Sequence, residues 1–483
     1  MWELNIFTHT VLPKPGAYEA KKITHKGGFY KKGGEEDFSD DTQNGLSLGK
    51  GGIKMETKLG RKMSRRKFLR YGAAAVGAVA LGGSKTAIGQ AKKPILIGIV
   101  SDASGNFADS GAAERRGMLM AIDEFNAKGG VLGRKIEYKH EDTETDPSAG
   151  ARKARRLIER ERADFLIGAL SSGVANAISE IAQREGIIYF NTNSSSDTVT
   201  NENCHRTNFA VDANNHMFSQ ALAPWVARNL GKRWYFFTHD YNFGKSGTED
   251  FRRILKAERG EEVGEILVPL GTRDFSAQLI KVMAAKPDVV MTTVGGIDLA
   301  ALTEQAHEFG TDKKIPFCFT QRDFPDVWAV GPKKNFGVFG VTWYHKLDLP
   351  GVKDFVARYK KRWPNAPIPI PENVSYAGYI GMRELLRGVE RAGTTQSHDV
   401  MKALEGWTFT DNMKHHPTTI RDFDHCFAQT IYIARAKPLE KMEDETDFYE
   451  ILGSSKPEDA AIKKEDSKCK MEPYANTPVY WMK

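Results

Sequence analysis

Residues 95–140 read ILIGIVSDASGNFADSGAAERRGMLMAIDEFNAKGGVLGRKIEYKH, and this stretch decides the fold class. The apolar run 95–100 predicts a buried strand of a parallel sheet, because such strands are covered on both faces. Residues 111–128 then place apolar side chains on one helical stripe, with charged side chains opposite. A Gly-Gly pair ends that helix, and residues 135–140 predict a second strand. The order strand, helix, strand is the βαβ unit of a parallel sheet.

The same alternation continues through most of the chain. A break near residues 212–216 separates two sets of apolar runs, which predicts two doubly wound parallel-sheet lobes of the α/β class. Residues 418–436 predict β-structure after a mainly helical region, and residues 440–483 are polar and irregular. Further strands are predicted at 165–170, 187–190, 234–238, 265–269, 289–294, 316–320 and 337–344, and further helices at 147–162, 174–185, 247–259, 275–285, 299–309, 351–363, 374–392 and 397–405.

The charge of the chain is concentrated at its N-terminal end. The 483 residues include 69 Lys or Arg and 62 Asp or Glu, a formal net charge of +7. Residues 1–89 hold 16 of the basic and 8 of the acidic residues, which leaves 53 basic and 54 acidic residues in 90–483. The body therefore lacks the basic footprint of a nucleic-acid-binding protein, and we expect no nucleic acid among its partners.

Residues 63–89 predict an export signal. A basic segment that contains Arg65 and Arg66 precedes the apolar run 72–83, and small residues follow it up to a cleavage site near Gln90. An apolar run of this length is shorter than the roughly 20 residues that span a bilayer. The arginine pair resembles the twin-arginine motif, so we expect the twin-arginine export machinery as a partner and a periplasmic or extracytoplasmic location.

Residues 1–62 precede that signal, are rich in Gly and Lys, and show little apolar periodicity. Either translation begins at Met63, which we favour, or these residues form a disordered extension. Residues 45–49 match the G-x-S-x-G pattern of a catalytic serine, but neither a predicted strand precedes them nor a predicted helix follows them. We interpret that match as chance.

Small polar residues follow six of the predicted strands. In open parallel sheets, ligands bind beyond the carboxyl ends of the strands. Hydroxyl and backbone N–H groups there can hold a carboxylate or an amide oxygen, and Phe107, Tyr241 and Phe243 would form walls. Such residues also serve as ordinary helix caps, but their recurrence favours a binding cleft between the lobes. The segments are 101–104, 171–173, 191–196, 239–244, 295–298 and 320–323.

Patterns for catalysis, a cofactor or a metal are missing from the sequence. The first predicted strand is not followed by the G-x-G-x-x-G of dinucleotide-binding proteins. Residues 244–246 match the end of a P-loop, but His239 stands where its first glycine is required. His415, His416 and His425 lack the spacing of a zinc site. We therefore expect neither a cofactor nor a metal.

The four cysteines are Cys204, Cys318, Cys426 and Cys469, and their spacing does not match a metal site. Export permits disulfides. Cys318 lies in an apolar run and is expected to be a buried thiol. Cys426 and Cys469 both lie in the C-terminal region, and a disulfide between them, closing about 40 residues, is the preferred pairing.

Four passages together resemble type I periplasmic solute-binding proteins of ABC importers, in the branch that binds Leu/Ile/Val, amides or urea. The resemblance covers about residues 94–436 and depends on the order and spacing of the passages. They are GAAERRGMLMAIDEFNAKGGVLG at 111–133, IGALSSGVANAISEIAQREGIIYFNTNSSSD at 167–197, HDYNFGKSG at 239–247 and DFSAQLIKVMAAKPDVVMTTVGG at 274–296.

The resemblance implies the type I periplasmic-binding fold, in which two α/β lobes are joined by three crossover strands and close on a ligand by a hinge motion. Lobe 1 would comprise residues 90–213 and 345–417, and lobe 2 residues 214–344 and 418–483. The implied function is that of a receptor without enzymatic activity, which binds a small polar solute and delivers it to an ABC permease in the membrane.

The resemblance also implies where the ligand binds. In lobe 1 the contacts fall at Ser171, Ser172, Asn193, Ser194 and Ser195, where amino-acid binders hold the ligand carboxylate. In lobe 2 they fall near Tyr241, Phe243, Ile297, Asp298 and Gln321, and Asp323 lies close by in sequence.

Two departures from the family bear on the ligand. Phe243 stands where tyrosine is common, and Gln321 stands where amino-acid binders carry an acid that pairs with the ammonium group. An amide oxygen does not neutralise a buried cation, so an amide, urea or a small carboxylate is favoured over an amino acid. Asp298 or Asp323 could restore the negative charge.

Two other functions remain open at this stage. A secreted enzyme could use Asp298 or Asp323 as a base, and it would convert its ligand instead of returning it unchanged. A sensory receptor lobe would act through a signalling partner, but the sequence lacks a second spanning segment, which weakens that interpretation.

Overall fold

The structure is a computed structural model that describes residues 92–481; the predicted export signal at 63–89 and the segment 1–62 lie outside the described residues. The first sheet is wholly parallel, with strand order β2-β1-β3-β4-β5. The apolar run quoted above forms β1, an inner strand that pairs with β2 and β3, as expected for a strand buried on both faces. The strands are β1 (Ile95–Ser101), β2 (Ile136–Asp142), β3 (Phe165–Gly168), β4 (Tyr189–Asn191) and β5 (Asn208–Ala210).

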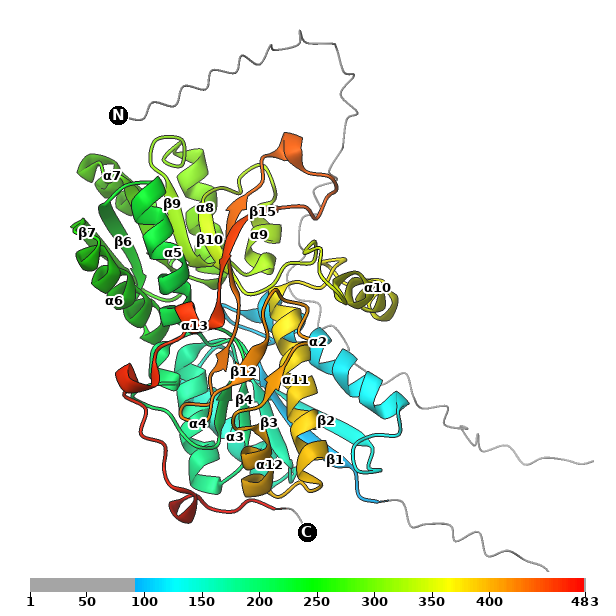
Figure 1. Ribbon diagram of the computed structural model, residues 1–483. Helices are drawn as coiled ribbons and strands as arrows, with labels where there is room; N and C mark the ends of the chain where they lie inside the picture. The colour runs from blue at the N-terminus through cyan, green and yellow to red at the C-terminus, as the bar shows by residue number, and fades with distance from the viewer. Residues whose placement is uncertain (1–91, 482–483) are drawn as a thin grey trace, which may run out of the picture. The chain divides into compact units, whose positions relative to one another are not determined.

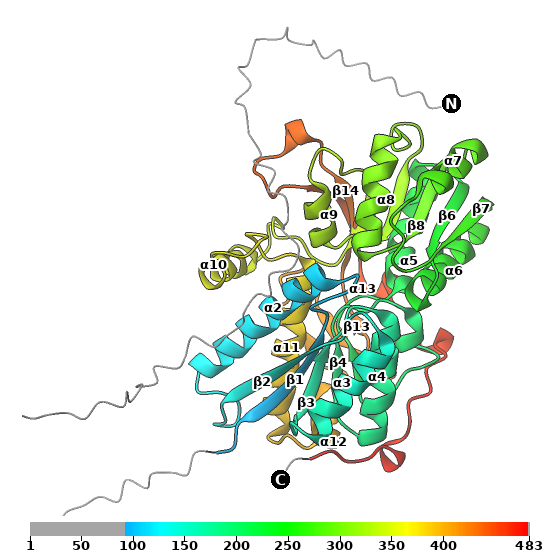
Figure 2. The same ribbon diagram turned by 180° about the vertical axis from the view of Figure 1, so that it is seen from behind.

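Helices cover both faces of this sheet (Figure 1). On one face α2 (Ala108–Ala127) packs along α11 (Asn373–Ala392). Their backbones approach closely because Gly117 and Gly378 lack a side chain: a Cβ atom at Gly117 would lie 1.9 Å from the Ser375 carbonyl oxygen. The other face carries α3 (Pro147–Glu159) and α4 (Ser172–Glu185), as Figure 2 shows, and α12 (Ser397–Leu404) packs against α11.

The second sheet has the order β15-β14-β10-β9-β8-β6-β7, in which β14 runs antiparallel to both of its neighbours, β10 and β15, and the other pairs are parallel. Phe236 is buried toward α5 and α6, and the next residue, Phe237, faces Phe275 at the start of α7. The strands are β6 (Arg233–His239), β7 (Glu261–Val268), β8 (Val289–Thr293), β9 (Phe317–Gln321), β10 (Val338–Val341), β14 (Ile431–Ala436) and β15 (Tyr449–Ser455). The helices are α5 (Asn215–Asn229), α6 (Asn242–Ala257), α7 (Ser276–Ala285), α8 (Gly296–Glu308) and α9 (Phe324–Val330). Helix α10 (Val352–Arg362) lies in the connection after β10 and contacts α2 and α11 of the first sheet's layer.

The predicted α/β class with parallel sheets is confirmed, and several short elements escaped prediction, among them β5, α9 and β15. Strand β5 and helix α9 are too short to show a periodic pattern. Strand β15 lies in the segment predicted to be irregular. It is a half-buried edge strand, so its sequence lacks the continuous apolar run of a central strand.

The chain passes between the two sheets at four places. The first three crossings are residues 211–214, 342–372 and 429–430, which follow β5, β10 and β13 (Phe427–Ala428). The fourth runs from β15 through α13 (Pro457–Ala460), whose Ala460 is buried in one cluster with Ala213 of the first crossing and Ile431 of β14. A small antiparallel sheet of β11 (Thr408–Phe409), β12 (Thr418–Ile420) and β13 completes the fold.

The C-terminal residues are distributed differently from the expected lobe boundaries, which assigned 418–483 as a whole to lobe 2. Strand β12 pairs with β11 and strand β13 pairs with β12, and the backbone of Cys426 forms an isolated β-bridge with Ala210 of the first sheet. The last residues also lie on the first sheet's side, where the Tyr480 hydroxyl donates to the Ala163 carbonyl oxygen at 2.7 Å. Only β14 and β15 of this segment join the second sheet.

The preferred disulfide between Cys426 and Cys469 is wrong, because Cys204 bonds to Cys469 instead. The tail folds back over the loop after β4, where the Lys468 ammonium forms an ion pair with Glu202 at 2.8 Å. Cys426 lies fully buried in the cluster around Ala460 and is a free thiol. Cys318 is a buried free thiol, as predicted.

Replacing Cys204 and Cys469 together by serine should lower the free energy of unfolding by about 2–5 kcal/mol, because the bond closes a long loop. Urea denaturation monitored by circular dichroism measures the loss. Alkylation of the denatured but unreduced chain should label Cys318 and Cys426, and labelling of Cys204 would contradict this pairing. Chemical reduction of the unsubstituted protein serves as the control and should reproduce the loss.

Candidate functional site

A small cavity lies where the carboxyl ends of strands from both sheets face each other. Residues after β1, β3 and β4 form one side, and residues after β6, β8 and β9 form the other. Its volume is about 20 Å³, room for roughly one water molecule. The lining residues are Phe107, Leu170, Ser172, Asn193, Ser195, Tyr241, Phe243, Gly295, Leu299, Gln321, Asp323 and Asp326.

Loops from the two sheets bond to each other directly around the cavity. The Ser195 hydroxyl donates to the Gln321 side-chain oxygen at 2.9 Å, and the Ser196 hydroxyl donates to the Asn242 carbonyl at 3.2 Å. Gly296 has φ of +66°, and a Cβ atom there would lie 2.6 Å from the Asn106 side-chain nitrogen. A solute larger than a water molecule can therefore enter only when these loops separate.

The wall from the first sheet presents hydroxyl and amide groups. Ser172 opens α4, so the first backbone N–H groups of that helix point toward this wall. The Ser172 hydroxyl accepts from the backbone N–H of Ser196 at 3.2 Å, which fixes the loop after β4. A helix N-terminus and hydroxyl groups favour a carboxylate or a carbonyl oxygen on the ligand.

Aromatic and aliphatic side chains form the sides of the cavity. The rings of Tyr241 and Phe243 lie 6.0 Å apart at the start of α6. Phe107 approaches Gly295 from the first sheet, where an added Cβ atom would lie 3.6 Å from its ring. Leu170 and Leu299 add apolar surface. These groups exclude water and strengthen the polar contacts inside.

The wall from the second sheet is acidic. Asp323 and Asp326 lie three residues apart at the start of α9, and the Asn373 side chain donates to the Asp323 carboxyl at 2.8 Å. Burial raises the pKa of Asp323 to about 6, and burial beside Asp323 raises the pKa of Asp326 well above its usual value. None of the described residues that line the cavity is basic. A ligand group that donates hydrogen bonds or carries positive charge would satisfy these carboxyl groups.

Most of the residues predicted for the site are brought together at this cavity. The predictions missed Asp326, although its spacing from Asp323 puts the two on neighbouring positions of one helical turn. They also missed Leu170, Gly295 and Leu299. The predicted residues that line the cavity are Phe107, Ser172, Asn193, Ser195, Tyr241, Phe243, Gln321 and Asp323.

Ser171, Ser194 and Ile297 do not line the cavity. Ser171 precedes α4, and its carbonyl oxygen accepts from the backbone N–H of Ala175. The Ser194 hydroxyl accepts from the Asn191 side chain at 2.7 Å, and this hydrogen bond stabilises the turn after β4. The Ile297 backbone N–H donates to the Asn106 carbonyl oxygen at 3.3 Å, beside the cavity.

Asp298 also lies outside the cavity, which corrects its assignment as a ligand contact or a base. Its carboxylate is fully buried and accepts from His239 at 3.0 Å and from the backbone N–H of Gly271 at 2.7 Å. Arg273 forms an ion pair with its second oxygen. These partners from separate loops occupy the carboxylate, so Asp298 is a structural group.

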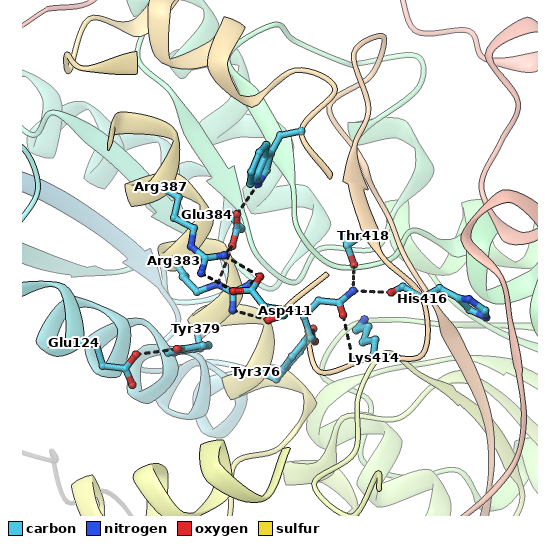
Figure 3. Close-up of polar contacts among 12 residues, drawn as sticks. Glu124, Tyr376, Tyr379, Arg383, Glu384, Arg387, Asp411, Lys414, His416 and Thr418 are labelled. Carbon is cyan, nitrogen blue, oxygen red and sulfur yellow. Dashed lines mark hydrogen bonds and ion pairs between the residues drawn. The ribbon is translucent and has the colours of Figure 1, made fainter. Parts of the chain in front are cut away.

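A second polar network surrounds α11, apart from the cavity (Figure 3). The buried Glu384 carboxylate accepts from Arg383 at 2.8 Å and Arg387 at 3.0 Å, while its other oxygen accepts from the Trp407 indole at 3.0 Å. Arg387 also pairs with Asp411 at 2.6 Å. Because these charges are paired with each other, the network stabilises the packing of α11 and offers a ligand no free acceptor on Glu384.

Within residues 92–481, the helices are all too short or too polar to cross a bilayer. The same residues contain no cluster of His, Cys, Asp and Glu side chains arranged to hold a metal ion.

Comparison with known proteins gives consistent results. The family described as periplasmic binding protein matches residues 94–443. The "Leu/Ile/Val-binding protein homolog 7" of Brucella abortus (strain 2308) is 27% identical over 329 residues, which cover 65% of this chain and 81% of the relative.

Solved structures agree with this assignment of the fold. A periplasmic binding protein from Burkholderia mallei is 26% identical, with a TM-score of 0.73, and the match covers 78% of this chain and 98% of that one. An amino acid ABC transporter substrate-binding protein from Pseudomonas fluorescens Pf-5 is 22% identical, with a TM-score of 0.72 and coverage of 79% and 100%. The second likeness concerns the fold alone.

Asp323→Asn should stabilise the solute-free protein at pH 7–8. The carboxyl group titrates near 3.8 in the unfolded chain and near 6 in the folded one, so stability is lost as the pH rises from about 4 to 6. Asparagine keeps the oxygen that accepts from Asn373 and does not ionise. The free energy of unfolding at pH 7–8 should therefore rise by at most about 3 kcal/mol.

Thermal unfolding between pH 4 and 8 measures this gain, which should disappear toward pH 4. Asp298→Asn is the matched control. It removes a charge that His239 and Arg273 bind, so it should destabilise the protein at neutral pH. A gain for Asp323→Asn that does not change with pH would contradict the expected titration.

Proposed function

Because the chain belongs to the periplasmic binding protein family, we propose that it is an extracytoplasmic receptor that binds a small polar solute between its two lobes and delivers it to an ABC permease. Members of this family and the structural neighbours are substrate-binding proteins, which supports a receptor over an enzyme. Membership also implies a periplasmic location.

One observation carries this proposal: a single cavity collects polar residues from the strand ends of both sheets, and loops from both sides close over it. Each side alone offers only half of the contacts. A solute that contacts both sides favours their approach, whereas the open arrangement lets it enter and leave. The crossings between the sheets would act as the hinge.

The two polar walls support a solute with two different ends. The hydroxyl groups of Ser172 and Ser195 and the start of α4 suit a carboxylate or carbonyl oxygen. The carboxyl groups of Asp323 and Asp326 suit an ammonium or an amide N–H group. A solute that carries both ends within a few atoms is an amino acid, a short amide or urea.

Within that class we propose a free amino acid first. Gln321 alone favours an amide, urea or a small carboxylate, since its side chain cannot neutralise an ammonium group. Asp323 and Asp326 supply negative charge at the same cavity, and a simple carboxylate would face them without a donor. The name of the Brucella relative, a Leu/Ile/Val-binding protein homologue, supports the same choice. Amides and urea are the second candidates because of Gln321.

Mass spectrometry of solute released by denaturing freshly purified protein tests the function directly. Recovery of an unchanged amino acid or amide supports a receptor, and a reaction product would support an enzyme that uses Asp323 as a base. A thermal-shift panel of leucine, valine, short amides, urea and small carboxylates should show stabilisation by nitrogen-containing solutes. Stabilisation by simple carboxylates alone would contradict the proposed class.

Ser172→Ala and Ser195→Ala should each weaken binding of that solute by about 5- to 150-fold, because each removes one hydrogen-bonding partner in a buried site. Isothermal titration calorimetry measures the change. Ser171→Ala is the matched control, since Ser171 adjoins Ser172 but does not line the cavity and its side chain makes no capping bond. Equal effects of Ser171→Ala and Ser172→Ala would exclude a specific role for this wall.

We further propose that Arg65 and Arg66 direct export through the twin-arginine machinery. Replacing both by lysine should leave the precursor in the cytoplasm, because the pathway distinguishes guanidinium from ammonium groups. Cell fractionation measures the result, and N-terminal sequencing of the exported chain should find a start near Gln90. Replacing only Lys67 by arginine is the control and should leave export unchanged, whereas normal export of the double variant would refute this route.

A further inference from the structure

Glu114 of α2 is buried directly behind the loop that carries Asn193 and Ser195. Its side chain is fully buried. Gly378 of α11 packs against it, so close that a Cβ atom there would lie 2.3 Å from the Glu114 carbonyl oxygen. The two helices therefore hold the carboxyl group at a fixed position relative to the first sheet.

Three donors from two strand ends converge on this carboxyl group. The Ser101 hydroxyl, at the end of β1, donates to one oxygen at 2.5 Å. The Thr192 hydroxyl and the Asn193 side-chain amide, both after β4, donate to the other oxygen, the amide at 3.3 Å. Of these donors, Asn193 also lines the cavity. One buried acceptor thus fixes a ligand-facing side chain and ties its loop to the neighbouring strand.

We propose that Glu114 is a positioning residue for solute binding: its ionised carboxylate holds Thr192 and Asn193 in the arrangement that the solute contacts. The proposal rests on the receptor function proposed above. Glu114 does not line the cavity, so it acts through Asn193 and not by touching the solute. An ionised acceptor binds three donors more strongly than a neutral one, and its protonation weakens all three bonds.

The surroundings of Glu114 place this protonation in an accessible range. Burial, with a smaller contribution from the nearby Asp102 carboxylate, raises its pKa to about 7, although the three hydrogen bonds lower it. The other titratable groups that interact with its charge are Arg115, the next residue on α2, and Tyr189 of β4. Above pH 7 the carboxylate predominates and the loop is held, whereas below pH 7 the group is neutral and the loop is held less firmly.

The first test uses no solute, so its outcome is independent of the proposed function. Hydrogen exchange of the backbone amides of residues 192–196, corrected for intrinsic rates, should lose protection about 10-fold in the unsubstituted protein between pH 8 and pH 6. Glu114→Gln should show the lower protection at both pH values. Glu124→Gln is the matched control, because Glu124 lies on the same helix, accepts from the Tyr379 hydroxyl (Figure 3), pairs with Arg358 and does not line the cavity.

The second test measures solute affinity. Glu114→Gln should weaken binding of the solute identified above about 10-fold at pH 8 and less at pH 6, and the Glu124→Gln control should bind normally. Thr192→Val removes one donor, keeps the side-chain shape, and should reduce both protection and affinity if Glu114→Gln does not fold. Protection of 192–196 that is the same in all variants and at each pH would overturn the proposal. A protection change without solute binding would leave Glu114 as the loop's anchor and refute the receptor function.

Discussion

Asp323 and Asp326 bring two carboxyl groups out of water at the end of one strand, beside a cavity whose described lining contains no base. A buried carboxylate without a partner is costly, and the raised pKa values of both groups reflect that cost. The Asn373 side chain donates to Asp323 and the backbone N–H of Gly296 donates to Asp326, so the chain supplies only part of the hydrogen bonds that the two carboxyl groups can accept. The chemistry of the site thus follows from a desolvated acid pair that the protein itself satisfies only in part.

The remainder of the fold places donors and acceptors around that pair. Parallel strands end at one edge of a sheet, so the loops after β1, β3 and β4 meet there, and those after β6, β8 and β9 meet opposite them. Burial of the Glu114 carboxylate is compensated differently from that of Asp323, because three donors of the chain bind Glu114. One side of the cavity is therefore fixed internally, and the other side depends on the ligand.

The sequence predicts much of this arrangement because the end of each apolar run marks the end of a strand. Ser195, Gln321 and Asp323 directly follow apolar runs, and parallel topology brings such residues together whatever the loop conformations are. The same reasoning fails for Asp298, which occupies an equivalent place after β8. His239 at the end of β6 and Arg273 in the loop after β7 reach its carboxylate, and contacts between segments far apart in sequence leave no signal in the local pattern.

The disulfide illustrates the same limit and changes how the lobes are connected. Cys426 and Cys469 are close in sequence, but the tail crosses to the first sheet and bonds to Cys204. Residues 444–481 lie beyond the match to the family, and they add a fourth crossing to the three that the resemblance implies. Ala460 of that crossing is buried in one cluster with Ala213 of the first crossing and with Ile431 of β14. In the proposed receptor, a separation of the two sheets that keeps this cluster packed would be a rotation about the crossings.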